Sequence, residues 1–162
     1  MRRELLLRWS DPAALGAAGR RMSGLDFLRA IRDGELPAPP MAVLLGMRLA
    51  EVEDARAVFE CLPGEQHYNP IGVVHGGLAM TLLDSAMTCA IQTRAAAGSG
   101  FTTVEAKANF VRPITAATGT IRALGTLIHA GSRLATAEGR VLDAAGKLYA
   151  HATTTCIVLN GS

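Results

Sequence analysis

The feature that most constrains this chain is a long run of helix-forming residues, 77–97, whose apolar side chains point in nearly every direction around the predicted helix axis. A helix that is apolar on all sides is a buried helix. The rest of the chain must therefore supply a surface that surrounds it. The apolar residues of this run are Leu78, Ala79, Met80, Leu82, Leu83, Ala86, Met87, Cys89, Ala90 and Ile91.

The residues after this helix have the composition of long strands joined by Gly-containing turns, which is typical of an antiparallel meander. In the segment 133–142, Ala and Gly alternate with larger side chains, so one face lets a helix approach closely. We therefore predict an α+β fold in which a curved antiparallel sheet wraps around one long central helix. The expected strands are 48–52, 55–61, 101–112, 119–129, 133–142 and 147–159.

The N-terminal part of the chain has a different character. Residues 1–22 are rich in Ala, Gly and Arg without a clear period, and we expect a mobile or loosely docked tail. Ser23 is a predicted N-cap of a helix that ends near Gly34, and a second short helix is expected at 41–45. The chain thus divides into an N-terminal segment, 1–40, and one domain, 41–162.

Composition excludes several classes of function. The 162 residues carry a formal net charge of only +2, with both signs scattered, so neither nucleic acid nor a membrane surface is expected as a partner. Three widely spaced cysteines form no zinc motif and no disulfide framework, and they favour a cytoplasmic location. These cysteines, Cys61, Cys89 and Cys156, are expected to pack as small apolar side chains.

Asp84 stands in the middle of the apolar helix, and no Lys or Arg lies one turn away to neutralise it. Burying an unpaired carboxylate costs several kcal/mol, so its presence needs a reason. One interpretation is that it meets a local water or caps a backbone N–H. The other is a catalytic base or nucleophile.

His75, Gly76 and Gly77 lie where the same helix begins. Free N–H groups and the positive end of the helix dipole point outward there, as an oxyanion hole requires, although a Gly pair at a helix start is often only a turn. Gly76 and Asp84 are separated by about 12 Å along the helix. Because reacting groups must lie within about 3.5 Å of each other, one chain cannot use both on the same carbonyl. Either the two groups have separate roles, or the site is shared between two chains; we infer a homodimer with two composite sites.

The pattern Asn69-Pro70, His75-Gly76-Gly77 and Asp84 resembles the PaaI-type acyl-CoA thioesterases of the hotdog fold. The resemblance runs from about residue 41 to 159 and includes the segments 105–113 and 149–154. It implies a curled antiparallel sheet around one helix, sites at a dimer interface, and tetramers built from two dimers. It implies no metal or organic cofactor, since coenzyme A is part of the substrate.

The resemblance also implies a role for each matching residue. Asp84 corresponds to the catalytic carboxylate, as a general base or a nucleophile, and Gly76 to the backbone N–H donor for the thioester oxygen. His75 and Asn69 correspond to residues near the thioester carbonyl and sulfur, and Thr103 to a Ser or Thr that holds the attacking water.

Other residues are weaker candidates for substrate contacts. Arg112 and Arg133 could meet the phosphates of coenzyme A, or could simply be solvated. Gly77, Met80, Met87 and Thr88 share the helix stripe of Asp84 and could contact the acyl group, although Met80 and Met87 are equally suited to the core. Two other functions on the same fold are a non-catalytic acyl-CoA-binding module and an acyl-thioester hydratase or dehydratase.

Overall fold

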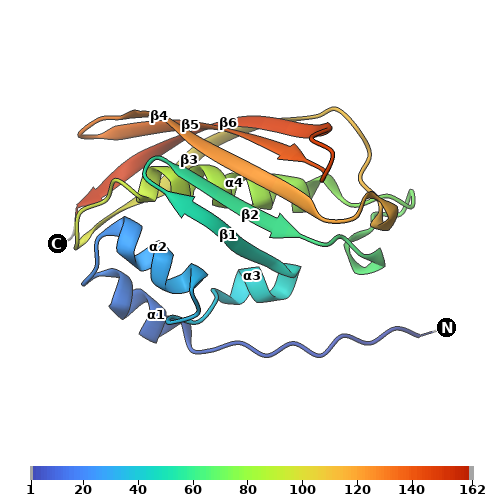
Figure 1. Ribbon diagram of the computed structural model, residues 1–162, viewed down its shortest axis with the longest axis horizontal. Coiled ribbons are helices and arrows are strands. Elements are labelled where there is room, and N and C mark those ends of the chain that lie inside the picture. Colours follow the sequence, from blue (N-terminus) through green and yellow to red (C-terminus); the bar gives the residue numbers. More distant parts are fainter. Residues whose placement is uncertain (1, 161–162) are drawn as a thin grey trace.

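The computed structural model describes residues 2–160 and has an α+β architecture. A six-stranded antiparallel sheet curves around one long helix, α4 (Gly76–Gln92), as predicted (Figure 1). The strand order is β1-β2-β4-β5-β6-β3. The strands are β1 (Met47–Glu53), β2 (Arg56–Cys61), β3 (Ser99–Phe110), β4 (Ile121–Ala130), β5 (Leu134–Leu142) and β6 (Leu148–Asn160).

Helix α4 lies against the concave face of the sheet at close range, because small residues on the strands leave room for it. A Cβ atom added to Gly125 of β4 would stand 2.2 Å from the carbonyl oxygen of Ala86. A Cβ added to Gly139 of β5 would meet the Met87 side chain at 2.9 Å. The helix residues that this contact buries completely are Leu82, Leu83, Ala86, Met87, Ala90 and Ile91.

The position of β3 differs from the predicted meander. The strands β4, β5 and β6 are consecutive neighbours, but β3 pairs with β6 at the far edge of the sheet rather than with β4. The connection 111–120, which contains Pro113 and the 3₁₀ turn η2 (Ala116–Thr118), is not a tight turn and carries the chain across the end of the sheet. One edge of β3 consequently has no neighbouring strand within residues 2–160.

Helix α4 is shorter than predicted and ends at Gln92 instead of 97. The hydroxyl of Thr93 donates to the carbonyl of Ala90 and accepts from the backbone N–H of Ala55, so this side chain ties the helix end to the β1–β2 turn. None of the helices in the described part of the chain is both long and apolar enough to cross a membrane.

The N-terminal segment is more ordered than expected. Residues 12–19 form a helix, α1 (Pro12–Gly19), with Asp11 as its N-cap, Pro at its first position and Leu15 buried. The prediction of a mobile or loosely docked tail over 1–22 did not include this helix, because its apolar residues are mostly Ala and give no amphipathic period. Met1 lies outside the described residues.

Helix α2 (Gly24–Arg32) begins at Ser23, as predicted, with the Ser23 hydroxyl accepting from the Asp26 N–H. The Gly24 N–H donates to the carbonyl of Ala95, so α2 is attached just beyond the C-terminal end of α4. Helix α3 (Pro40–Leu45) follows and ends at Gly46 in the left-handed conformation. These helices lie on one side of the molecule, below β1 in Figure 1.

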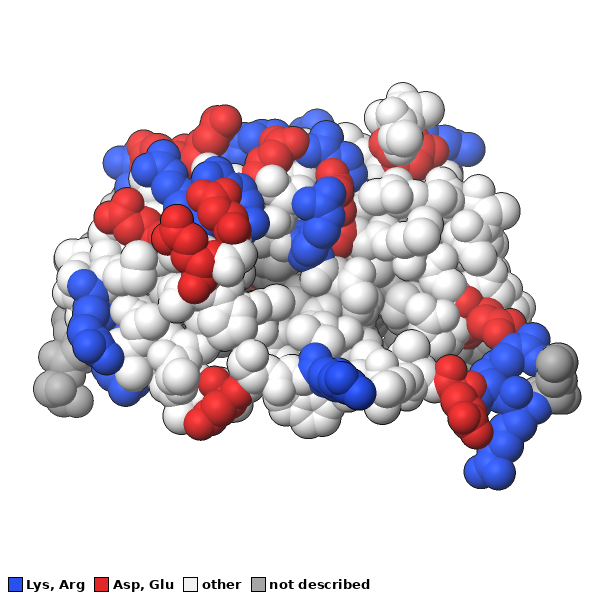
Figure 2. Space-filling model, turned by 60° about the horizontal axis from the view of Figure 1, so that its bottom comes forward, with Lys and Arg blue, Asp and Glu red and all other residues white. Residues whose placement is uncertain are grey.

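Charged side chains are unevenly distributed on the side shown in Figure 2. They gather along the upper rim of this view and at the end that carries the N-terminus, and a broad band between them carries few. The surface of this band is therefore mostly uncharged.

Candidate active site

The start of α4 presents one unused backbone donor. His75 is the N-cap, and its Nδ1 accepts a hydrogen bond of 2.8 Å from the Gly77 N–H. An imidazole that accepts at Nδ1 carries a proton on Nε2, and no acceptor for Nε2 lies among residues 2–160. Within residues 2–160 the Gly76 N–H has no acceptor, while the Gly77 N–H is already satisfied by the cap. Gly76, not Gly77, is thus the available donor.

The loop before the helix is held by Asn69. Its Oδ1 accepts from the backbone N–H groups of Ile71 and Val73, at 3.1 and 3.4 Å. The Val74 N–H donates to the carbonyl of Ile114, which anchors the end of the loop. The Asn69 oxygen is therefore committed to shaping the loop, and only its amide nitrogen remains to meet a ligand.

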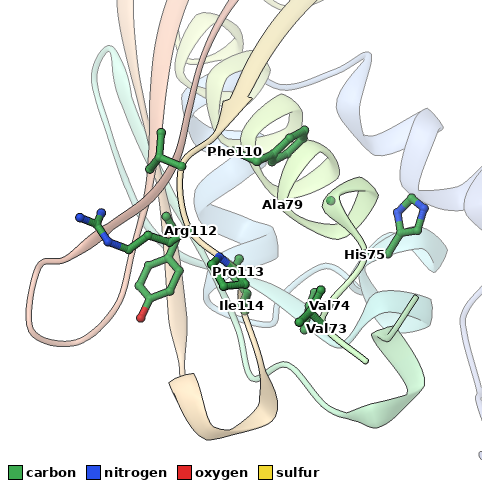
Figure 3. Close-up of a pocket in the computed structure, with 11 residues that line it drawn as sticks. Val73, Val74, His75, Ala79, Phe110, Arg112, Pro113 and Ile114 are labelled. Atoms are coloured by element: carbon green, nitrogen blue, oxygen red, sulfur yellow. The ribbon is translucent and has the colours of Figure 1, made fainter. Parts of the chain in front are cut away.

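A pocket of about 340 Å³ opens beside this helix start (Figure 3). Gly76 and Ala79 of α4 line one wall, and Phe110 and the residues after it line the other. Arg112 lines this pocket too, but its guanidinium donates to the carbonyl of Leu148 and its side chain extends to the side opposite His75.

Asp84 lies further along α4, half-buried, and is held by hydroxyl groups. The hydroxyl of Thr103 on β3 donates to Asp84 Oδ1 at 2.8 Å, and that of Thr88 lies 3.0 Å from Thr103 Oγ and 3.5 Å from Asp84 Oδ1. Because Thr103 donates its single hydroxyl proton to the carboxylate, it accepts from Thr88, and a chain of hydrogen bonds runs from Thr88 through Thr103 to Asp84. No Lys, Arg or His among the described residues forms an ion pair with Asp84.

The Asp84 carboxylate opens into a second pocket, of about 530 Å³. The predicted contact Met80 lines it, whereas Met87 is fully buried under the sheet against Gly139 and belongs to the core. Sequence reasoning did not find the other lining residues, because a cavity wall forms only when separate elements pack. These residues are Met41, Thr81, Ser85, Val104, Glu105 and Ala106.

The two pockets follow one another along the groove between α4 and β3. Residues 73–79 lie opposite 110–114 at one end, and residues 80–85 lie opposite 103–106 at the other. Gly76 and Asp84 are therefore brought to the same groove but not to the same point, in agreement with the separation of about 12 Å along the helix. Arg133 lies elsewhere, in a pocket with Ser132 at the β4–β5 turn.

The cysteines do not act as ready nucleophiles. Burial, and to a smaller degree the Asp84 carboxylate, raises the pKa of the Cys89 thiol to about 12, and burial raises the pKa of Cys61 to about 11. Both are protonated near neutral pH and pack as apolar groups. Cys156 is buried with its Sγ 3.9 Å from the hydroxyls of Thr88 and Thr103.

Known proteins share this fold and parts of this sequence. Residues 71–150 match the model of the thioesterase superfamily. A putative thioesterase of Ralstonia eutropha, described as a phenylacetic acid degradation-related protein, is 26% identical over 80% of this chain and 98% of its own, with a TM-score of 0.72. A mutant of the phenylacetic acid degradation protein PaaI from Thermus thermophilus is 27% identical over 74% and 98%, with a TM-score of 0.66.

The PaaI protein of Escherichia coli shares the fold at 21% identity, over 86% of this chain and 97% of its own, with a TM-score of 0.72. No curated protein matches the chain by sequence. The sheet and the central helix define a hotdog fold, and residues 71–150 of this chain are similar to the thioesterase superfamily. Among the proteins of this fold, it resembles the PaaI-type thioesterases.

Proposed function

We propose that the protein hydrolyses the thioester of an acyl- or aroyl-coenzyme A to the free acid and coenzyme A, in the cytoplasm. The observation that carries this proposal is the half-buried Asp84 carboxylate, held by the Thr103 hydroxyl and opening into a pocket without a neutralising cation among the described residues. A carboxylate in this setting is suited to abstract a proton from water or to attack a carbonyl carbon.

The second part of the proposal is a homodimer that completes the site. One edge of β3 has no neighbouring strand within residues 2–160, and β3 and the residue after it carry three exposed apolar side chains, Val104, Phe110 and Val111. Pairing of two such edges about a two-fold axis near the middle of β3 would turn the two grooves head to tail. Gly76 of one subunit would then approach Asp84 of the other. Two such dimers could form a tetramer.

In this arrangement the Gly76 N–H stabilises the negative charge that develops on the thioester oxygen, a contribution of about 3 kcal/mol. The partner's Asp84 removes a proton from water as it adds to the carbonyl carbon, or adds to that carbon itself. The carbon–sulfur bond then breaks, and the sulfur leaves as coenzyme A with a proton, which Asp84 returns when water is the nucleophile. When Asp84 itself attacks, an acyl–aspartyl anhydride forms, and water then hydrolyses it, which releases the acid, supplies the proton and restores the carboxylate. His75 Nε2 and the Asn69 amide nitrogen orient the thioester.

We propose a role for Thr103 that differs from holding the attacking water. Its hydroxyl proton is directed at Asp84, so we assign it the orientation of the carboxylate, with its oxygen lone pairs shared between Thr88 and an incoming water. The test is thiol release from a panel of acyl- and aroyl-CoA thioesters. Release with none of them would refute hydrolysis, and tight binding of the same compounds without turnover would indicate a binding module.

A further inference from the structure

Two pockets along α4 meet at two side chains, of which one is flexible. The Asp84 cavity, about 530 Å³, adjoins one of about 370 Å³ that reaches toward the start of the helix. Both are lined by Met41 and Thr81, and no other described residue lines both. The second pocket is open to solvent and has an apolar part formed by Leu45, Tyr68 and Leu78. Its polar part includes Gln66, His67 and His75.

The two shared residues differ in rigidity. Thr81 belongs to α4, and its hydroxyl donates to the Gly77 carbonyl at 2.9 Å, so its side chain is fixed. Met41 belongs to α3, which is fixed by Pro40 at its start and by Ala42, buried against the core. The Met41 side chain itself is 51% exposed, unbranched and able to change rotamer.

We propose that Met41 is the residue that sets the length of the acyl group. This inference rests on the proposed hydrolysis of acyl-CoA thioesters. An acyl group whose carbonyl lies beside Asp84 occupies the larger cavity and meets Met41 at its end. Short straight-chain acyl groups fit without moving Met41, whereas longer chains must displace it to enter the cavity lined by Leu45 and Leu78.

The test compares Met41→Ala, Met41→Phe and wild type with butyryl-, hexanoyl-, octanoyl-, decanoyl- and dodecanoyl-CoA. Leu44→Ala is the matched control, since Leu44 lies on the same helix, is similarly exposed and lines neither cavity. A pocket contact with one methylene changes kcat/KM by roughly tenfold or more. Met41→Ala is expected to raise kcat/KM for dodecanoyl- relative to butyryl-CoA at least tenfold, and Met41→Phe to lower it.

An unchanged length profile in Met41→Ala, or the same change in Leu44→Ala, would overturn the role of Met41. Affinities for the matching S-alkyl-CoA thioethers, measured by calorimetry, keep this result separate from catalysis. If wild type released no thiol but Met41→Ala still shifted binding toward longer chains, the proposed hydrolysis would be wrong and the role of Met41 would stand. If binding did not shift either, the role of Met41 would fall too.

Discussion

The sharing of each site between two subunits can be tested with two inactive variants. Asp84→Asn keeps the shape of the side chain and an oxygen that can accept from Thr103, but removes the base. Loss of a positioned base lowers kcat by about 10²- to 10⁴-fold. The second variant, Gly76→Pro, removes the oxyanion donor.

Proline suits position 76 because Gly76 is the first residue of α4, where proline is favoured and a missing N–H breaks no helix hydrogen bond. His75 already has φ −61° and ψ 133°, the extended conformation that a residue before proline requires. Loss of one oxyanion donor lowers kcat by about 10²- to 10³-fold. Each variant alone is therefore expected to be nearly inactive while remaining folded.

The two variants are then mixed in equal amounts, unfolded and refolded together, and assayed for thiol release. Random pairing makes about half of the dimers mixed. In a mixed dimer with shared sites, one site carries both wild-type Gly76 and wild-type Asp84 and the other carries neither. Activity should recover to about one quarter of wild type, far above either variant alone.

The control mixes each variant with the double variant Gly76→Pro/Asp84→Asn, which can form no intact site. Exchange of subunits is verified by mass spectrometry on subunits of different mass. If mixed dimers form and activity stays at the level of the separate variants, then Gly76 and Asp84 do not act across the interface, and the proposed dimer site is wrong.

Three further outcomes follow from the same geometry. Gly125→Ala should lower the free energy of unfolding by about 1–3 kcal/mol, because its Cβ would meet the Ala86 backbone at 2.2 Å, whereas Gly100→Ala, with nothing nearer than 3.8 Å, should change the denaturant midpoint little. Thr103→Val should lower kcat by about tenfold and Thr103→Ser should restore it, because the hydroxyl is the part of this side chain that contacts Asp84. Equal rates for the Val and Ser variants would show that Thr103 has no role in the reaction. Burial lowers the pKa of His67 below 6.5 in the folded protein, so as the pH drops His67 is protonated at a higher pH in the unfolded chain than in the folded one. The melting temperature should therefore fall as the pH drops below about 6.5. His67→Gln should reduce this fall, and an identical pH profile in the variant would contradict the role of His67.

The central helix could be predicted because its signal is local. Apolar residues on every side of a helix require burial, whatever surrounds it. The Ala and Gly face of β5 likewise indicated close approach, and Gly139 against Met87 confirms it. The end of α4 was misplaced; the hydrogen bond that ties it to the β1–β2 turn, Thr93 with Ala55, joins residues far apart in sequence and leaves no local signal.

The position of β3 was missed for a related reason. Its alternating composition predicts a strand but does not indicate which strand it pairs with. That choice depends on the path of residues 111–120 across the sheet. Asp84 could be found from sequence because a charge inside an apolar helix is conspicuous, whereas Thr103 was found only through the family resemblance. Nothing in the sequence marked Met41 as a cavity wall.

The placement of β3 also bears on why, in the proposed mechanism, a single subunit would leave the site incomplete. The strand that supplies Thr103 to Asp84 is the same strand whose other edge has no neighbour among the residues that the structure describes. An unpaired edge is a liability that proteins cover, and the apolar side chains on this one favour covering by a second chain. In the proposed dimer, the pairing that covers the β3 edge also brings the Gly76 N–H of one subunit to Asp84 of the other. A lone subunit then holds a carboxylate without the donor it needs, so the chemistry is assembled only where two copies have paired.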